Sequence, residues 1–139
     1  MADSPLTVEI ITPQKVVYSG KAVSVSMPGS LAPFQVLSRH APIVSSLEVG
    51  LIRIVGQNNN YTWFAVGSGF TEVLANRVSI LVEHAVEASS INTDSTRANL
   101  AQDKEKLKAT EDPVKKAEIK ELILFGETCL KAAEKNQIN

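Results

Sequence analysis

The segment most informative about the architecture runs from Met27 to Ile54 and reads MPGSLAPFQVLSRHAPIVSSLEVGLIRI. It combines short apolar runs with residues that form tight turns. A Pro-Gly pair opens it, Phe34–Leu37 is extended, and Ser38–Pro42 forms a compact corner before a new strand begins at Leu51. Neither a metal-ligand cluster nor a phosphate-binding loop lies within it. We therefore interpret this segment as a structural part of the fold that contains no active site.

Residues 1–88 are predicted to form an antiparallel β-sandwich. Short runs rich in Val, Ile, Thr and aromatic residues recur, and Gly, Pro, Asn or Ser residues interrupt them about every 6–12 positions. About eight to ten short strands are therefore expected. Gly67–Gly69 is expected to permit a bulge or a close approach of two backbones. The predicted strands span residues 7–12, 16–18, 22–27, 34–37, 43–47, 51–55, 61–66, 70–74 and 78–83.

The composition changes near residues 85–92. Residues 89–139 carry nine acidic and nine basic side chains, against six and five in residues 1–88, and Phe125 is their only aromatic residue. This change predicts two domains: a sandwich at 1–88 and a helical domain at 89–139. The chain is then α+β by content.

Residues 89–139 are predicted to form an antiparallel hairpin of two helices. Helix-forming residues without Gly or Pro predict a first helix over 94–110, with Thr93 or Asp94 as its cap. Glu111–Pro113 interrupts this helix, and a second helix is expected over 114–135 because Pro is tolerated in a first turn.

The predicted hairpin lacks apolar area for a core of its own. The first helix offers mainly Leu100 and Leu107, and at about 1.5–3 kcal/mol for each buried large side chain this gives only a few kcal/mol. We therefore expect the hairpin to dock elsewhere, weakly enough to change its position. The apolar face predicted for the second helix comprises Ile119, Leu122, Ile123, Leu130 and Ala133.

Composition excludes several functional classes. The formal net charge of −1 argues against binding to nucleic acid or to an anionic membrane surface, and 44% hydrophobic residues argue against disorder. No targeting segment and no membrane-spanning helix is expected, so the protein is predicted to be soluble, and peripheral if it associates with a membrane. A single cysteine suits a reducing compartment.

The residues that could carry catalysis are few and scattered. His40 and His84 are the only histidines, so no metal site is expected. Ser38 lies near His40 but has no acidic partner or oxyanion motif, so no catalytic residue is assigned. Cys129 is expected to be an unactivated thiol on a helix.

One polar group, Asp94-Ser95-Thr96-Arg97-Ala98, stands out at the start of the first predicted helix. Asp94 and Arg97 are one turn apart on the same side of this helix. Two interpretations remain open: a capped helix with an ion pair, or a small anion or nucleotide site in which Arg97 meets phosphate and Asp94 meets a base or an amine.

The order of motifs along the whole chain resembles the epsilon subunit of rotary F-type ATP synthases, the counterpart of the mitochondrial delta subunit. The corner Phe34–Pro42 is the strongest match, through Phe34, Leu37, His40, Ala41 and Pro42. The other matching segments are residues 8–13, Gly20, 27–29, 47–54, 69–73 and 76–78.

The resemblance implies a non-catalytic rotor subunit that couples proton transport to ATP synthesis. Its sandwich would bind the gamma subunit and the c-ring in the central stalk. Its hairpin would lie folded on the sandwich or extend towards the alpha and beta subunits and restrain ATP hydrolysis. No cofactor is required, but Asp94, Arg97 and Ala98 match a motif that binds regulatory ATP in some bacterial members. The implied location is the cytoplasmic face of the bacterial inner membrane. The chloroplast thylakoid membrane is the second, less favoured location.

The sequence departs from the family at several positions. Ser30–Pro33 replaces a Gly-rich loop, Gln35 replaces a common Gly, and Ser38-Arg39 replaces a common Pro-Gly. Thr93 stands where the ATP motif has Ile or Leu, and Lys104 where another Arg can occur. The alternative function is a free-standing interaction module, a sandwich with a dimerising hairpin. An enzyme using Ser38 and His40 is a third reading that no feature favours.

Overall fold

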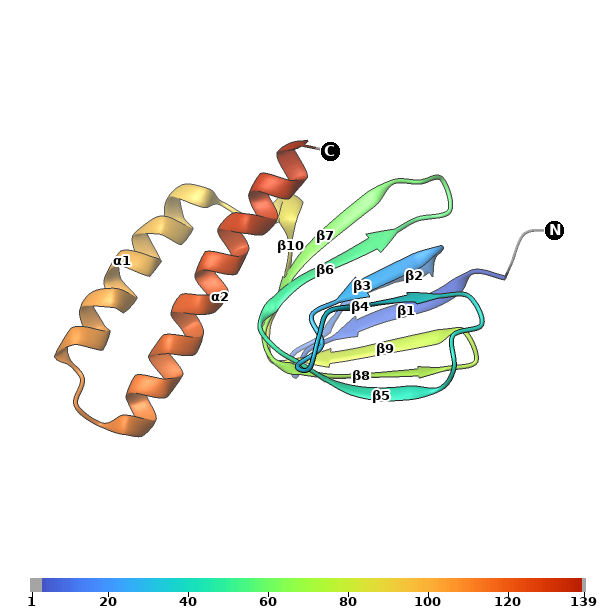
Figure 1. The fold of residues 1–139 in the computed structure, drawn as a ribbon. Coiled ribbons are helices and arrows are strands. Elements are labelled where there is room, and N and C mark those ends of the chain that lie inside the picture. Colours follow the sequence, from blue (N-terminus) through green and yellow to red (C-terminus); the bar gives the residue numbers. More distant parts are fainter. Residues whose placement is uncertain (1–3, 139) are drawn as a thin grey trace.

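The computed structural model describes residues 4–138 and shows a two-sheet sandwich followed by two helices (Figure 1). Ten strands lie within this described range. They are β1 (Leu6–Ile11), β2 (Val16–Ala22), β3 (Ser24–Met27), β4 (Phe34–Leu37), β5 (Ile43–Leu47), β6 (Gly50–Val55), β7 (Tyr61–Val66), β8 (Gly69–Leu74), β9 (Arg77–Val82) and β10 (Ala85–Glu87). A 3₁₀ turn η1 (Ala88–Ser90), helix α1 (Thr93–Ala109) and helix α2 (Pro113–Ile138) follow.

Each sheet contains five strands. The first sheet has the order β2-β1-β9-β8-β5, and the second has the order β10-β7-β6-β3-β4. The pairings are antiparallel except between β1 and β9, which run parallel. The expected sandwich is thus confirmed, but it is not antiparallel throughout. A parallel pair requires a long connection, and here most of the sandwich lies between the two strands.

The core lies between the two sheets. In β1, Leu6, Val8 and Ile10 are fully buried, while Thr7 and Glu9 on the opposite face are partly exposed. This alternation follows from the two-residue period of a strand and recurs along the other strands. The largest buried side chains are Phe64, Leu6, Ile10, Ile52, Ile54 and Ile80.

Strand β2 is longer than the sequence suggested. A strand ending at Ser19–Gly20 was expected, but the backbone stays paired with β1 as far as Ala22, which lies opposite Leu6. Gly20 does not end the strand, because it stays paired with Val8 of β1. Its lack of a side chain makes room for Tyr18, whose hydroxyl oxygen would lie 2.8 Å from a Cβ at this position. Val23, inside the predicted strand 22–27, instead lies between β2 and β3 and is 45% exposed.

Helix α1 is capped by a residue that the sequence analysis did not select. We expected Thr93 or Asp94, but the helix begins at Thr93 and Asn92 is its cap. The Ser95 backbone N–H donates to Asn92 Oδ1 at 2.9 Å, which satisfies one of the free amides of the first turn. Asn92 can do this because its φ of −89° and ψ of 108° are extended.

The hairpin is folded against the sandwich. Figure 1 shows α2 between α1 and the sheets, and α2 contacts β7, β6 and η1. Within residues 4–138, no helix is both long enough and apolar enough to cross a membrane.

Candidate functional site

The interface between α2 and the second sheet is built from small side chains. Ala65 of β7 and Ala132 of α2 are fully buried, and Cys129 and Ala88 are nearly so. Small residues allow the helix to approach the sheet closely, and each of them buries little apolar area. Larger side chains border this cluster, namely Leu51, Trp63, Ile91 and Phe125.

The face of α2 that packs on the sandwich differs from the apolar face that was predicted. Phe125, Cys129 and Ala132 follow the helical spacing of four and three residues, yet none of them was assigned to the apolar face. Of the residues that were assigned, Ile123 and Ala133 are buried, but Leu122 remains 45% exposed. The expected face mixed residues from different sides of α2, because several of its sides carry apolar residues.

Polar and aromatic contacts at the rim complete the docking. Ser68 Oγ donates a hydrogen bond to Glu121 Oε1 at 2.9 Å. The rings of His84 and Phe125 lie 5.4 Å apart, and Lys135 Nζ lies 5.5 Å from the centroid of Trp63. Contacts of this kind at an exposed rim contribute about 1 kcal/mol or less each to docking. They therefore favour one orientation of α2 on the sheet but add little to the stability of the docked state.

Burial raises the pKa of the Cys129 thiol from 9.0 to about 11. The thiol is therefore protonated at neutral pH, in agreement with the expectation of an unactivated cysteine. Its pKa is raised while α2 packs on the second sheet, so its burial supports docking fully below pH 9. This support is lost as the pH rises towards 11, because the undocked thiol ionises first.

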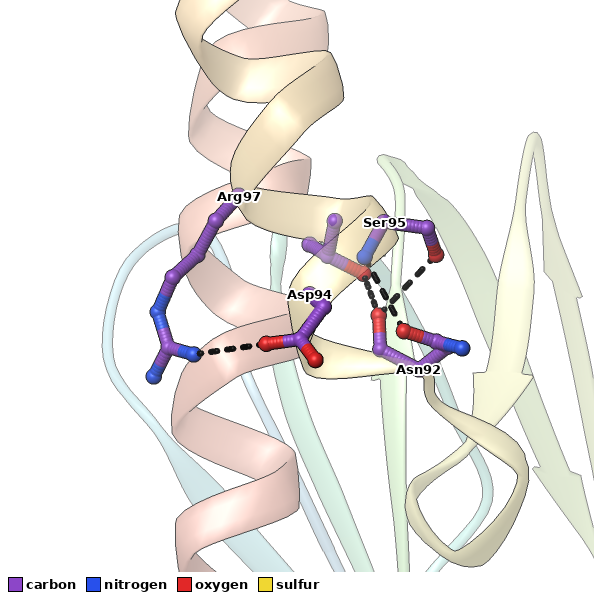
Figure 2. A network of polar contacts seen from close by, with 5 residues as sticks. Asn92, Asp94, Ser95 and Arg97 are labelled. Atoms are coloured by element: carbon purple, nitrogen blue, oxygen red, sulfur yellow. Dashed lines mark hydrogen bonds and ion pairs between the residues drawn. The ribbon is translucent and has the colours of Figure 1, made fainter.

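Asp94 and Arg97 meet at the start of α1, as their spacing predicted (Figure 2). Arg97 Nη1 lies 3.8 Å from Asp94 Oδ1, and the two side chains are 65% and 98% exposed. Asn92 holds this turn through three further bonds: it accepts from Ser95 N–H and from the hydroxyls of Ser95 and Thr96, the last at 2.7 Å. Ala98 is exposed on the next position.

This ion pair agrees with the capped-helix interpretation and leaves the nucleotide interpretation untested. An ion pair so open to water contributes little to stability, so the two charges remain available to a ligand. Asp94 also lies where a negative charge suits the positive end of the helix dipole. The cleft between α1 and α2 is lined by other residues of α1, including Thr96, Asn99 and Asp103.

The corner that follows β4 is fastened to the β8–β9 turn. Arg39 has a φ of 66°, in the left-handed region, which explains why a Pro-Gly turn occupies this place in the resembling family. Asn76 accepts a hydrogen bond from the Arg39 backbone N–H at 2.8 Å and donates to Ser38 Oγ at 3.3 Å. The corner is thus held by tertiary contacts that no local motif predicted.

The residues that carry the resemblance play different roles in this corner. Phe34 packs against the sandwich core, whereas Leu37, Ala41 and Pro42 are exposed. His40 closes the turn, because its backbone N–H donates to the Leu37 carbonyl and its Nδ1–H donates to the Ala41 carbonyl at 2.7 Å. Their interface role stays a prediction.

Ser38 and His40 do not hydrogen-bond with each other. Ser38 Oγ donates to the Ser4 carbonyl at 2.9 Å, and the His40 ring turns to Ala41. Across the described part of the chain, no group of three or more His, Cys, Asp or Glu residues is arranged to hold a metal ion.

A second surface, on the outer face of the first sheet, was missed by the sequence analysis. Here Val44, Phe70, Leu74 and Leu81 are between 37% and 68% exposed, and Phe70 lies directly opposite Leu81 across β8 and β9. Exposed apolar side chains gathered on one face are typical of a protein interaction surface. The signal was present in β9, whose run Val78–Val82 includes an apolar residue on each face.

Comparisons with known proteins point in one direction. The family model described as "ATP synthase, Delta/Epsilon chain, beta-sandwich domain" matches residues 5–88. The ATP synthase epsilon chain of Leptospira interrogans is 33% identical over 102 residues, which is 73% of this chain and 80% of that protein. The epsilon chain of Campylobacter jejuni is 37% identical over 101 residues, which is 73% of this chain and 78% of that protein.

Solved structures share the fold over nearly the whole chain. A chain in the Euglena gracilis mitochondrial ATP synthase (OSCP/F1/c-ring) matches with a TM-score of 0.77 at 15% identity, covering 96% of this chain and 84% of that one. A chain in the Tetrahymena thermophila mitochondrial ATP synthase central stalk and c-ring matches with a TM-score of 0.63 at 17% identity, covering 96% and 99%. These likenesses include the helices as well as the sandwich.

Proposed function

Because this chain belongs to the ATP synthase delta/epsilon family, we propose that it is a non-catalytic rotor subunit in the central stalk of an F-type ATP synthase. The match of residues 5–88 to the family's sandwich domain carries this proposal. In this role the subunit transmits rotation and so couples proton transport to ATP synthesis. It works by contact, not by chemistry of its own.

The surfaces for partner subunits are those that the hairpin leaves free. The exposed apolar residues on the outer face of the first sheet, such as Phe70 and Leu81, suit a permanent protein contact. The corner at Leu37–Pro42 offers a second, rigid contact. We assign these two surfaces to the gamma subunit and the c-ring. Attachment through the complex places the subunit at the membrane periphery, at the cytoplasmic face of a bacterial inner membrane.

The hairpin is proposed to act as a switch. Its small-residue interface with the sandwich is the kind of contact that two packings of similar free energy require. When released, the hairpin would extend along gamma towards the alpha and beta subunits and restrain ATP hydrolysis. The alternative, a free module that dimerises through α2, rested on the predicted apolar face of α2; Ile123 and Ala133 of that face are buried within this chain, whereas Leu122 is exposed.

Deleting residues 89–139 in the assembled synthase is expected to raise ATP hydrolysis while the subunit still co-purifies with gamma. The sandwich surfaces remain, so assembly persists, and the restraining element is gone. Hydrolysis by purified complex, with subunit content read from a gel, checks both points. Loss of association of the full-length chain with any synthase would contradict the rotor role. Normal assembly with unchanged hydrolysis would contradict only the switch.

ATP is proposed to bind at the start of α1 and to favour the folded hairpin. Calorimetry on the full-length chain is expected to show heat of binding that Arg97→Ala reduces at least about tenfold in affinity, since a charged hydrogen bond to phosphate is lost. Arg39→Ala, remote in sequence and outside the motif, serves as the control. Absence of heat from the wild-type chain at millimolar ATP would refute the site.

A further inference from the structure

A cleft of about 590 Å³ lies between the outer face of the second sheet and helix α2. Its size is that of a pocket for a small organic molecule. Apolar walls come from Phe34, Leu51 and Leu124, and polar groups come from Arg53, Trp63 and Lys131. None of these residues belongs to the Asp94–Arg97 group, which lies on α1, and α1 is separated from the sheets by α2 (Figure 1).

The floor of this cleft is a straight row of hydrogen-bonding side chains. Strand register places Gln35 of β4 opposite Ser26 of β3, Ser26 opposite Arg53 of β6, and Arg53 opposite Trp63 of β7. Residues directly opposite one another point to the same face of a sheet. An amide, a hydroxyl, a guanidinium and an indole N–H therefore follow one another across four adjacent strands.

Two donors in this row are buried and lack a protein partner. Arg53 Nε and Trp63 Nε1 are inaccessible to solvent, and neither has a hydrogen-bond acceptor within the described chain. The Arg53 guanidinium makes a long bond to Ser26 Oγ, at 3.4 Å, and its central carbon lies 5.2 Å from the centroid of the Tyr61 ring and 6.0 Å from that of Trp63. Buried donors without acceptors are rare in folded proteins and call for an acceptor supplied from elsewhere.

The charged side chains that line the cleft are all positive. Arg53 and Lys131 line it, Lys135 lies beside it over the Trp63 ring, and its lining includes no Asp or Glu. The ion pairs found among residues 4–138 involve Arg77, Arg97 and Lys108, and none involves these three cations. Cations gathered around an apolar wall, with N–H donors and no carboxylate, favour an anion that also carries an apolar body.

We propose that this cleft binds a small aromatic or similarly flat organic anion, carrying a phosphate or a carboxylate. The anionic oxygens accept hydrogen bonds from Lys131 Nζ and from the terminal nitrogens of the Arg53 guanidinium, and a small shift of the covering side chains brings Trp63 Nε1 within reach. The flat apolar part lies on Phe34, Leu51 and Leu124. Because Arg53 and Trp63 belong to the sandwich and Lys131 to α2, a bound anion bridges the two and favours the folded hairpin.

Trp63 is the only tryptophan in the chain, so its fluorescence reports directly on the cleft. Phenyl phosphate is the probe, titrated into the full-length chain, and benzyl alcohol is its neutral counterpart. We expect a saturable change in Trp63 emission with phenyl phosphate and none with benzyl alcohol. Arg53→Met and Lys131→Met are each expected to weaken phenyl phosphate at least about tenfold, because each removes one charged donor.

Matched controls separate this site from nonspecific charge effects. Lys120→Met removes a lysine from the same helix outside the cleft, and Arg97→Ala removes the cation of the α1 group; both are expected to bind like the wild type. Lys131 is exposed on α2, so its replacement is expected to leave the fold intact. The affinity of Lys131→Met for phenyl phosphate therefore tests the proposal even if Arg53→Met unfolds. Absence of saturable binding at millimolar phenyl phosphate, equal binding of benzyl alcohol, or unchanged affinity in Lys131→Met would overturn the proposal.

Discussion

Ala132→Glu is expected to release the hairpin from the sandwich while leaving the sandwich folded. Ala132 is fully buried, in one cluster with Ala65, which is also fully buried. A glutamate there must either bury an unpaired carboxylate or push α2 off the sheet, and either costs several kcal/mol. The small-residue interface cannot offset such a cost, so the undocked state becomes the stable one.

Alkylation of Cys129 measures this release. In the folded chain the raised pKa, about 11 instead of 9.0, leaves about 100-fold less thiolate at pH 8 than an exposed cysteine has. Ala132→Glu is therefore expected to speed alkylation by iodoacetamide about 100-fold. Ala117→Glu introduces the same charge at an exposed position of α2 and should change little. Unchanged alkylation of a variant that retains its helix content would show that the hairpin docks more tightly than its contacts suggest.

Under the proposed function, the same variant should act opposite to hairpin deletion. An undocked hairpin is free to extend towards the alpha and beta subunits, so ATP hydrolysis by a complex carrying Ala132→Glu should fall, whereas deletion should raise it. A rise with both changes would mean that the docked hairpin is the restraining form.

Gly69→Ala is expected to destabilise the sandwich by about 3 kcal/mol or more. Gly69 begins β8 opposite Val82, and a Cβ there would overlap the carbonyl oxygen of Leu81 and lie 2.8 Å from the Val82 Cα. These are backbone atoms of the neighbouring strand, so no side chain can turn aside to make room. The two strands would have to separate at this end of the β8–β9 pair, beside β9, the middle strand of the first sheet.

Gly67→Ala provides the matched control for this loss. Its Cβ would lie 3.2 Å from the His84 backbone nitrogen and 3.4 Å from a ring carbon, distances that a small shift accommodates. Denaturant unfolding of both variants should show a much lower midpoint for Gly69→Ala than for Gly67→Ala. Equal midpoints would mean that β8 and β9 can move apart at little cost.

Local sequence was sufficient wherever a short pattern has one structural solution. Alternating β-branched residues bounded by turns predicted most strands, and charge-rich stretches without Gly or Pro predicted both helices. Gly67–Gly69 was read as a place for close backbone approach, and at Gly69 the structure confirms it. The errors arose where a neighbour distant in sequence decides the outcome, as when pairing with β1 carries β2 past Gly20.

The segment Met27–Ile54 illustrates the division between sequence and tertiary structure. Its residue order contributed the strongest single match to the family, the corner Phe34–Pro42, and predicted the positions of its strands, because turns and alternation act over a few residues. Only the folded chain showed that Asn76 fastens the corner at Arg39, and that Arg53 from this segment aligns with Ser26 and Trp63 beneath α2. Register and docking bring together residues tens of positions apart, and they depend on the summed packing of two sheets and a helix, which no local pattern encodes.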